Sequence, residues 1–228
     1  MKILKKGSLF LLLLFWIIQR FSKTEMGLLF GPLKYYGLAL LYPAVVLGLT
    51  GLIVFICGDY AIEAPDWGKI LLNTAVGCTI GVIALMLTEE GFFRGLIWAS
   101  FIQSGLSNKH TLWLTSAFFT IWHISAVTSG SEYGLPIEQV PVYLINATLL
   151  GLIWGLLRMM SGSIIVASLS HTVWNTFAYE LFGFGEKVGS LGVENTKWFG
   201  PEVGYLGILL NGLFFIWLWK KANKDELI

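Results

Sequence analysis

The chain has 228 residues, of which 56% are hydrophobic and only 13% are charged. A soluble domain carries about 25% charged residues, so this chain has too few polar side chains to cover a soluble globule. The net charge of +1 gives no indication of nucleic-acid binding. Ten Trp and sixteen Phe suit a bilayer, whose interfaces favour aromatic rings. We therefore expect an integral membrane protein.

Apolar stretches of the chain approach the length of about 20 residues that a membrane-spanning helix needs. They lie near residues 8–21, 38–57, 70–100, 111–127, 142–159, 163–182 and 203–219. Transmembrane barrel strands would alternate polar and apolar residues, and these stretches do not. The sequence therefore predicts an all-α fold, a polytopic bundle of about six to seven membrane helices in one integral membrane domain, residues 1–228.

One of these stretches, residues 70–100, is too long for a single upright span. As one helix it would reach about 45 Å, so we expect it to tilt or to project beyond the bilayer. The first stretch, residues 8–21, is short and follows three lysines, which fits either a spanning or an interfacial helix. Lys220, Lys221 and Lys224 favour a cytoplasmic C-terminus by the positive-inside rule.

Ionisable and amide side chains interrupt three of the apolar stretches. They are Glu89, Glu90 and Arg94 in the third, His123 in the fourth, and His171 with Asn175 in the sixth. Charged groups inside membrane helices cost roughly 2.5–3.5 kcal/mol each, so they need partners or a function. The end of the stretch at 70–100 and the starts of those at 111–127 and 163–182 lie on the same membrane side. Counted from that side at 1.5 Å per residue, Glu89, His123 and His171 lie about 12–18 Å deep. We expect these side chains to converge on one polar cavity, which opens to the cytoplasm in the orientation given above.

The spacing within the first group separates two carboxylates. Glu90 and Arg94 are four residues apart on a helix, so they can form an ion pair. Glu89 is turned by about 100° from Glu90 and is left free, because an α-helix has 3.6 residues per turn. A free carboxylate in a poorly solvated cavity can act as a general base.

The other two groups offer hydrogen-bonding side chains. His171 and Asn175 are also four residues apart, so one helix face presents both to a developing oxyanion. His123 can share or orient a water molecule with Glu89. Phe119, one turn before His123, is expected to lie in the core.

Together these residues form three motifs that resemble a known family, the CAAX prenyl protease type II and bacteriocin-processing family of intramembrane glutamic proteases. The motifs are Glu-Glu-x-x-x-Arg at residues 89–94, Phe-x-x-x-His at 119–123 and His-x-x-x-Asn at 171–175. The Ser-Gly-Ser-Ile turn at 161–164 is also similar to the family. The resemblance covers residues 70–182, which we take as the catalytic core.

The resemblance implies hydrolysis of a peptide bond in a membrane-associated protein or peptide, without a cofactor. It implies water activation by Glu89 with His123, an oxyanion site at His171 and Asn175, and support from Glu90 and Arg94. The short chain is similar to bacterial members, which act in peptide maturation, in immunity to self-made bacteriocins or in regulation. The expected location is the bacterial cell membrane.

Three alternatives remain open from the sequence. Glu89, His123 and His171 would form a two-histidine, one-carboxylate zinc site, although the chain has no His-Glu-x-x-His helix. A non-catalytic membrane immunity or binding protein would keep the fold without needing Glu89. A proton-coupled transporter would use the same carboxylates, but we find no paired repeats with interrupted helices.

Overall fold

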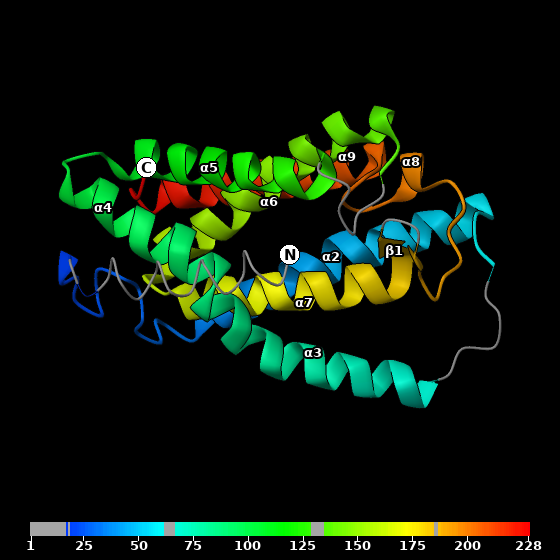
Figure 1. Ribbon diagram of the computed structural model, residues 1–228, viewed down its shortest axis with the longest axis horizontal. Coiled ribbons are helices and arrows are strands. Elements are labelled where there is room, and N and C mark those ends of the chain that lie inside the picture. The colour runs from blue at the N-terminus through cyan, green and yellow to red at the C-terminus, as the bar shows by residue number, and fades with distance from the viewer. Residues whose placement is uncertain (1–16, 18, 62–66, 129–134, 185–186) are drawn as a thin grey trace.

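The computed structural model is a bundle of helices, described for residues 17, 19–61, 67–128, 135–184 and 187–228 (Figure 1). The longer helices are α2 (Lys34–Cys57), α3 (Trp67–Leu87), α5 (Asn108–Thr128), α6 (Val140–Ser161), α7 (Ile164–Phe182) and α9 (Tyr205–Lys224). Shorter helical elements are η1 (Gly91–Ile97), α4 (Trp98–Gln103), η2 (Ile137–Gln139) and α8 (Thr196–Phe199). The all-α prediction is confirmed, with the addition of a small antiparallel pair of strands, β1 (Gly183–Phe184) and β2 (Lys187–Val188).

Three of the described helical segments are long and apolar enough to cross a membrane. They are Lys34–Cys57, Gly68–Gln103 and Ile137–Ser161. The expected stretch at 8–21 lies almost wholly outside the described residues, and the total of six to seven spans stays a prediction. The three segments agree with the integral membrane protein that the composition indicates.

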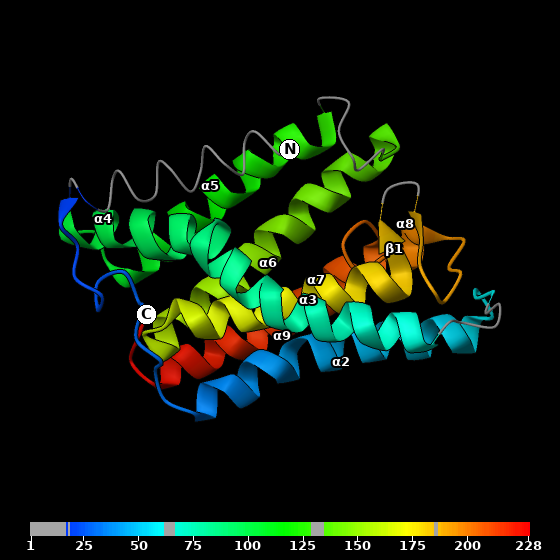
Figure 2. The same cartoon turned by 60° about the horizontal axis from the view of Figure 1, so that its bottom comes forward.

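Helix α6 is at the centre of the bundle, where it packs against α2, α5, α7 and α9. Figures 1 and 2 show α5 on one side of this group and α3 running beside α7 on another. The side chains of Trp154, Leu156 and Leu157 in α6 are almost completely buried. Van der Waals packing of these side chains holds α6 in place and gives the other helices a common surface to pack on.

Helix α3 is peripheral, because its main contact with the bundle is α7. Gly77 and Gly81 of α3 face Thr176 and Thr172 of α7. A Cβ added at Gly81 would lie 2.7 Å from the Thr172 Cγ2 atom, and one at Gly77 would lie 2.6 Å from the Thr176 Oγ1 atom. Small residues thus allow the two backbones to approach closely, which is a common way for membrane helices to associate.

The long stretch at 70–100 lies in a helical segment, Gly68–Gln103, that bends, and its expected tilt or projection beyond the bilayer stays a prediction. Helix α3 ends at Leu87, and a π-helix, η1, begins at Gly91 and leads into α4. In Figure 2 the chain changes direction between α3 and α4. A π-helix has wider turns than an α-helix and re-aims the side chains around it, and such turns occur often at functional sites. The bend directly follows Glu89 and Glu90.

The segment that precedes α2 ties three parts of the chain together. The backbone oxygen of Gly27 accepts a hydrogen bond from the Ile164 N–H at the start of α7. The Arg158 guanidinium near the end of α6 donates to the backbone oxygens of Arg94 and Glu25, at 3.2 and 3.0 Å. These contacts fix the segment against η1 and against the first turn of α7.

The structure also makes the predicted membrane topology testable. Ser107 lies beside Asn108, whose side chain donates to the Leu227 oxygen near the C-terminus. Ser190 lies at the other end of α7, where its N–H donates to the Glu180 oxygen. Because α7 runs from one end of the bundle to the other, single cysteines at Ser107 and Ser190 are expected to react from opposite membrane sides, with Ser107 inside. Labelling of both by an impermeant reagent added outside contradicts this topology.

Candidate active site

The buried carboxylate of Glu90 joins two of the three motifs. Its Oε1 atom accepts hydrogen bonds from Arg94 Nη1 at 3.1 Å and from His171 Nδ1 at 2.9 Å. Arg94 Nη2 donates to the backbone oxygen of Gly151 in α6 at 3.0 Å. The side chains of Glu90 and Arg94 are both 0% exposed. The ion pair predicted from their spacing is confirmed, and it also holds α6 and α7 against η1.

Phe119 from the second motif covers this ion pair. The Arg94 Cζ atom lies 4.3 Å from the centre of the Phe119 ring, a cation–π contact in a site without solvent. Phe119 is almost fully buried, which confirms its predicted core position. Its ring therefore has a second function that the sequence did not indicate, which is to shield the Arg94 charge.

Glu89 differs from its neighbour Glu90 in exposure and in hydrogen bonding, although both carboxylates lie near His171. Its side chain is 17% exposed, and its Oε2 atom lies 3.9 Å from His171 Nε2. No residue in the described part of the chain makes a hydrogen bond to the Glu89 side chain. The imidazole of His171 therefore lies between the two carboxylates, with Nδ1 bonded to Glu90 and Nε2 facing Glu89. This leaves the Glu89 carboxylate accessible to a water molecule.

The contacts of His171 restrict what its ring can donate. A carboxylate only accepts, so the Nδ1 atom that contacts Glu90 carries a proton. A neutral His171 then has a lone pair at Nε2, and only the imidazolium form has a second N–H there. The oxyanion role expected for His171 thus requires the protonated ring.

His123 is held by its own helix. Its Nδ1 atom lies 2.7 Å from the Phe119 backbone oxygen, and because a carbonyl only accepts, this nitrogen is the donor. The Nε2 atom of a neutral His123 is then an acceptor. The Phe119 ring centre lies 4.2 Å from that of His123 and 6.1 Å from that of His171. One aromatic ring thus adjoins both imidazoles.

Trp154 is a site residue that the sequence did not reveal. Its indole stacks on the His171 imidazole, with ring centres 3.7 Å apart and planes inclined by 16°. Trp154 is 1% exposed, and its Nε1 atom has no hydrogen-bond partner among the described residues. In the sequence α6 reads as an ordinary apolar span, so no local signal separated this Trp from lipid-facing or core aromatics.

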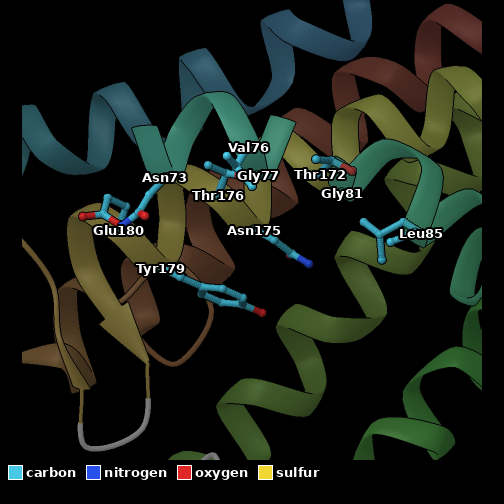
Figure 3. Close-up of a pocket in the computed structure, with 11 residues that line it drawn as sticks. Asn73, Val76, Gly77, Gly81, Leu85, Thr172, Asn175, Thr176, Tyr179 and Glu180 are labelled. Atoms are coloured by element: carbon cyan, nitrogen blue, oxygen red, sulfur yellow. The ribbon is translucent and has the colours of Figure 1, made fainter. Parts of the chain in front are cut away.

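Asn175 lies one turn after His171 and lines a cavity of about 450 Å³ between α3 and α7. In Figure 3 its side chain and that of Tyr179 point into the same space. Asn175 makes no hydrogen bond to any described residue. Its carboxamide N–H groups are therefore available to a bound molecule.

The alternative zinc site at Glu89, His123 and His171 is not assembled in the structure. Within the described ranges, no group of three or more His, Cys, Asp or Glu side chains is arranged to hold a metal ion. In both His123 and His171 the Nδ1 atom already donates its hydrogen to a neighbouring oxygen. The Nε2 atom of each ring is therefore the nitrogen that can accept a proton.

Substitution of Arg94 by Leu is expected to destabilise the protein by about 3–5 kcal/mol, because it leaves the buried Glu90 charge without its cation. The double variant Arg94→Leu/Glu90→Gln is expected to be more stable than Arg94→Leu alone. Thermal unfolding in detergent measures both. A double variant less stable than Arg94→Leu contradicts the pairing.

Trp154→Leu is expected to shift the imidazole signals of His171 in nuclear magnetic resonance spectra of protein labelled at histidine nitrogen. The reason is that Leu has neither the ring current nor the flat face of the indole. Trp154→Phe keeps an aromatic face and serves as the matched control, with a smaller shift. Unchanged His171 signals in Trp154→Leu would show that the stack does not exist in solution.

Comparison with known proteins agrees with the three motifs. Residues 70–177 match the family described as type II CAAX prenyl endopeptidase Rce1-like, a range that includes most of α3, η1, the Phe119–His123 motif and Asn175. No curated protein and no solved structure matches the chain. The three apolar helical segments agree with a family of membrane proteases. Residues 70–177 therefore form a domain of the Rce1-like type II CAAX prenyl endopeptidase family, a family of proteases.

Proposed function

We propose that the protein is an intramembrane endopeptidase that hydrolyses a peptide bond of a membrane-associated protein or peptide, with Glu89 as the general base. The observation that supports this most is the contrast between two adjacent carboxylates. Glu90 is completely buried and accepts two hydrogen bonds, whereas the Glu89 side chain is 17% exposed and faces an imidazole. Glu90 thus organises the site, and Glu89 is the carboxylate that reaches water.

In the proposed reaction Glu89 removes a proton from a water molecule while the water oxygen attacks the scissile carbonyl carbon. The Nε2 lone pair of His123 accepts the second water hydrogen and orients the attacking oxygen. The carbonyl π electrons move onto the carbonyl oxygen, and a tetrahedral oxyanion forms. A positioned general base contributes about 10²–10⁴-fold to such a rate.

Asn175 and the imidazolium form of His171 stabilise the oxyanion by donating hydrogen bonds. Asn175 has unused amide donors, and His171 lies between the Glu89 and Glu90 carboxylates. The proton held by Glu89 then passes to the amide nitrogen, and the C–N bond breaks. Because water is the nucleophile, the reaction needs no Ser or Cys.

The site is proposed to face the cytoplasm of a bacterial cell. The support is the cluster of Lys220, Lys221 and Lys224 at the end of α9, which favours a cytoplasmic C-terminus. The start of α7 lies at the same end of the bundle as the end of α6. His171 is about 10 Å along α7 from that start, at 1.5 Å per residue.

Glu89→Gln is expected to abolish proteolysis and to leave the protein folded and inserted. Gln keeps the size of Glu but cannot take a proton from water, so the loss should be at least about 10²–10⁴-fold. A comparison of membrane peptidomes from cells with wild type and with Glu89→Gln identifies the cleaved peptide. That peptide then serves as the substrate for purified protein in liposomes.

The matched control is Glu194→Gln, which removes an exposed carboxylate from a loop. Full activity in Glu89→Gln rejects Glu89 as the general base. Absence of any cleavage by the wild type favours the non-catalytic binding protein, which keeps the Glu90 pair without using Glu89. Chelators are expected to have no effect. Activity lost to a chelator and restored by zinc indicates the metal-dependent alternative.

A further inference from the structure

The cavity beside Asn175 is one part of a groove that follows the line between α3 and α7. Its walls are formed by Asn73, Val76, Gly77, Gly81, Ala84 and Leu85 of α3 and by Thr172, Asn175, Thr176, Tyr179 and Glu180 of α7. Figure 3 shows Asn73 and Glu180 at one end and Leu85 at the other. The groove thus runs from the level of the candidate site towards the start of α3 and the end of α7.

The opposite end of the site is packed with protein. Met26, from the segment before α2, is 2% exposed and lies against Gly95 of η1. The neighbouring Gly27 is bonded to Ile164 at the start of α7. The groove leads from Asn175 away from this packed end.

The walls of the groove carry polar side chains that have no hydrogen-bond partner among the described residues. The Thr172 Oγ1 atom is buried without a hydrogen-bond partner. The side chains of Thr176 and Asn73 make no hydrogen bond to any described residue. Other helical threonines donate to the backbone oxygen one turn earlier, namely Thr50, Thr79, Thr88, Thr115 and Thr148. The hydroxyls of the groove threonines are thus free to bond to a molecule in the groove.

The chemistry of this wall distinguishes between two kinds of occupant. An acyl or isoprenoid chain offers no hydrogen bonds, so it gains nothing from Asn and Thr side chains. An unwound polypeptide in a bilayer has N–H and C=O groups that must find partners. The outer face of α3 is apolar and exposed at Leu72, Ile80 and Ile83, so no water is available there for that purpose.

We propose that the groove between α3 and α7 binds the substrate as an unwound polypeptide segment, which hydrogen-bonds to Asn73 and Thr176 and leads its scissile carbonyl to Asn175. This inference rests on the proposed endopeptidase function. From Asn73 to Leu85 the groove wall extends about 18 Å at 1.5 Å per residue. At about 3.3 Å per residue, that length holds about five residues of extended chain.

Glu180 adds a charge to the far end of the groove. Its side chain forms no ion pair with any described residue, and it lines the groove beyond Thr176. A carboxylate in this position attracts a basic side chain of the substrate, about 7.5 Å along α7 from Asn175 at 1.5 Å per residue. The substrate segment is therefore expected to be apolar with a Lys or Arg at that end.

The test uses purified Glu89→Gln protein in liposomes, so that a bound peptide is not cleaved. One probe is a synthetic apolar peptide with a central Gly-Gly pair, a terminal Lys and a photoreactive diazirine. The other is a diazirine-bearing isoprenoid alcohol. The peptide is expected to label α3 and α7 along the groove. Asn73→Leu and Thr176→Val should each lower this labelling about threefold to tenfold, as expected for one lost hydrogen bond.

Thr79→Val is the matched control, because Thr79 is an exposed α3 residue outside the groove whose hydroxyl bonds to Ala75. Its labelling should equal that of the parent protein. Isoprenoid labelling of the groove in place of peptide labelling overturns the inference, as does equal peptide labelling in Asn73→Leu and Thr79→Val. Absence of peptide labelling also overturns it.

The two proposals can fail separately. Groove labelling by the peptide without any cleavage by the wild type leaves the binding groove standing and rejects the endopeptidase. Cleavage that depends on Glu89, with no peptide labelling between α3 and α7, keeps the endopeptidase and rejects the groove.

Discussion

The carboxylate of Glu90 is the interaction on which the rest of the site depends. A charge buried away from water is strongly unfavourable unless it is paired and hydrogen-bonded. Glu90 meets this requirement through Arg94 on its own segment and His171 on α7, and Arg94 in turn reaches the α6 backbone at Gly151. One buried charge thus forces η1, α6 and α7 into a single arrangement. The position of Glu89 follows from it, because Glu89 is the preceding residue.

Helical periodicity was sufficient to predict the contacts that lie within one segment. The Glu90–Arg94 pair and the core position of Phe119 are of this kind, and the structure confirms both. The partner of His171 was not predictable, because it depends on how α7 crosses the π-helical turn. That crossing is set by the bend after Leu87, and a local sequence pattern does not specify such a bend. The site roles of Glu89 and Asn175 stay predictions.

The contact of Trp154 with His171 was not predictable from the sequence either, because it depends on how the helices pack. A Trp in an apolar stretch is compatible with lipid, with the core or with a site, and its sequence neighbours do not distinguish these environments. In the structure, the central position of α6 brings its indole against the His171 ring. The close approach of α3 and α7 at Gly77 and Gly81 is likewise a contact between segments about ninety residues apart, although small residues at that spacing are compatible with it.

The spacing of Glu90 and Arg94 also bears on how the chain enters the membrane. Each charge alone would raise the cost of inserting the α3–α4 segment by roughly 2.5–3.5 kcal/mol. Because the two residues are one turn apart on the same segment, they can neutralise each other as soon as that segment is helical, before α6 and α7 have been synthesised. An equivalent pair placed on two different helices would leave two isolated charges during biogenesis. The ion pair thus reduces an early insertion barrier as well as organising the finished bundle.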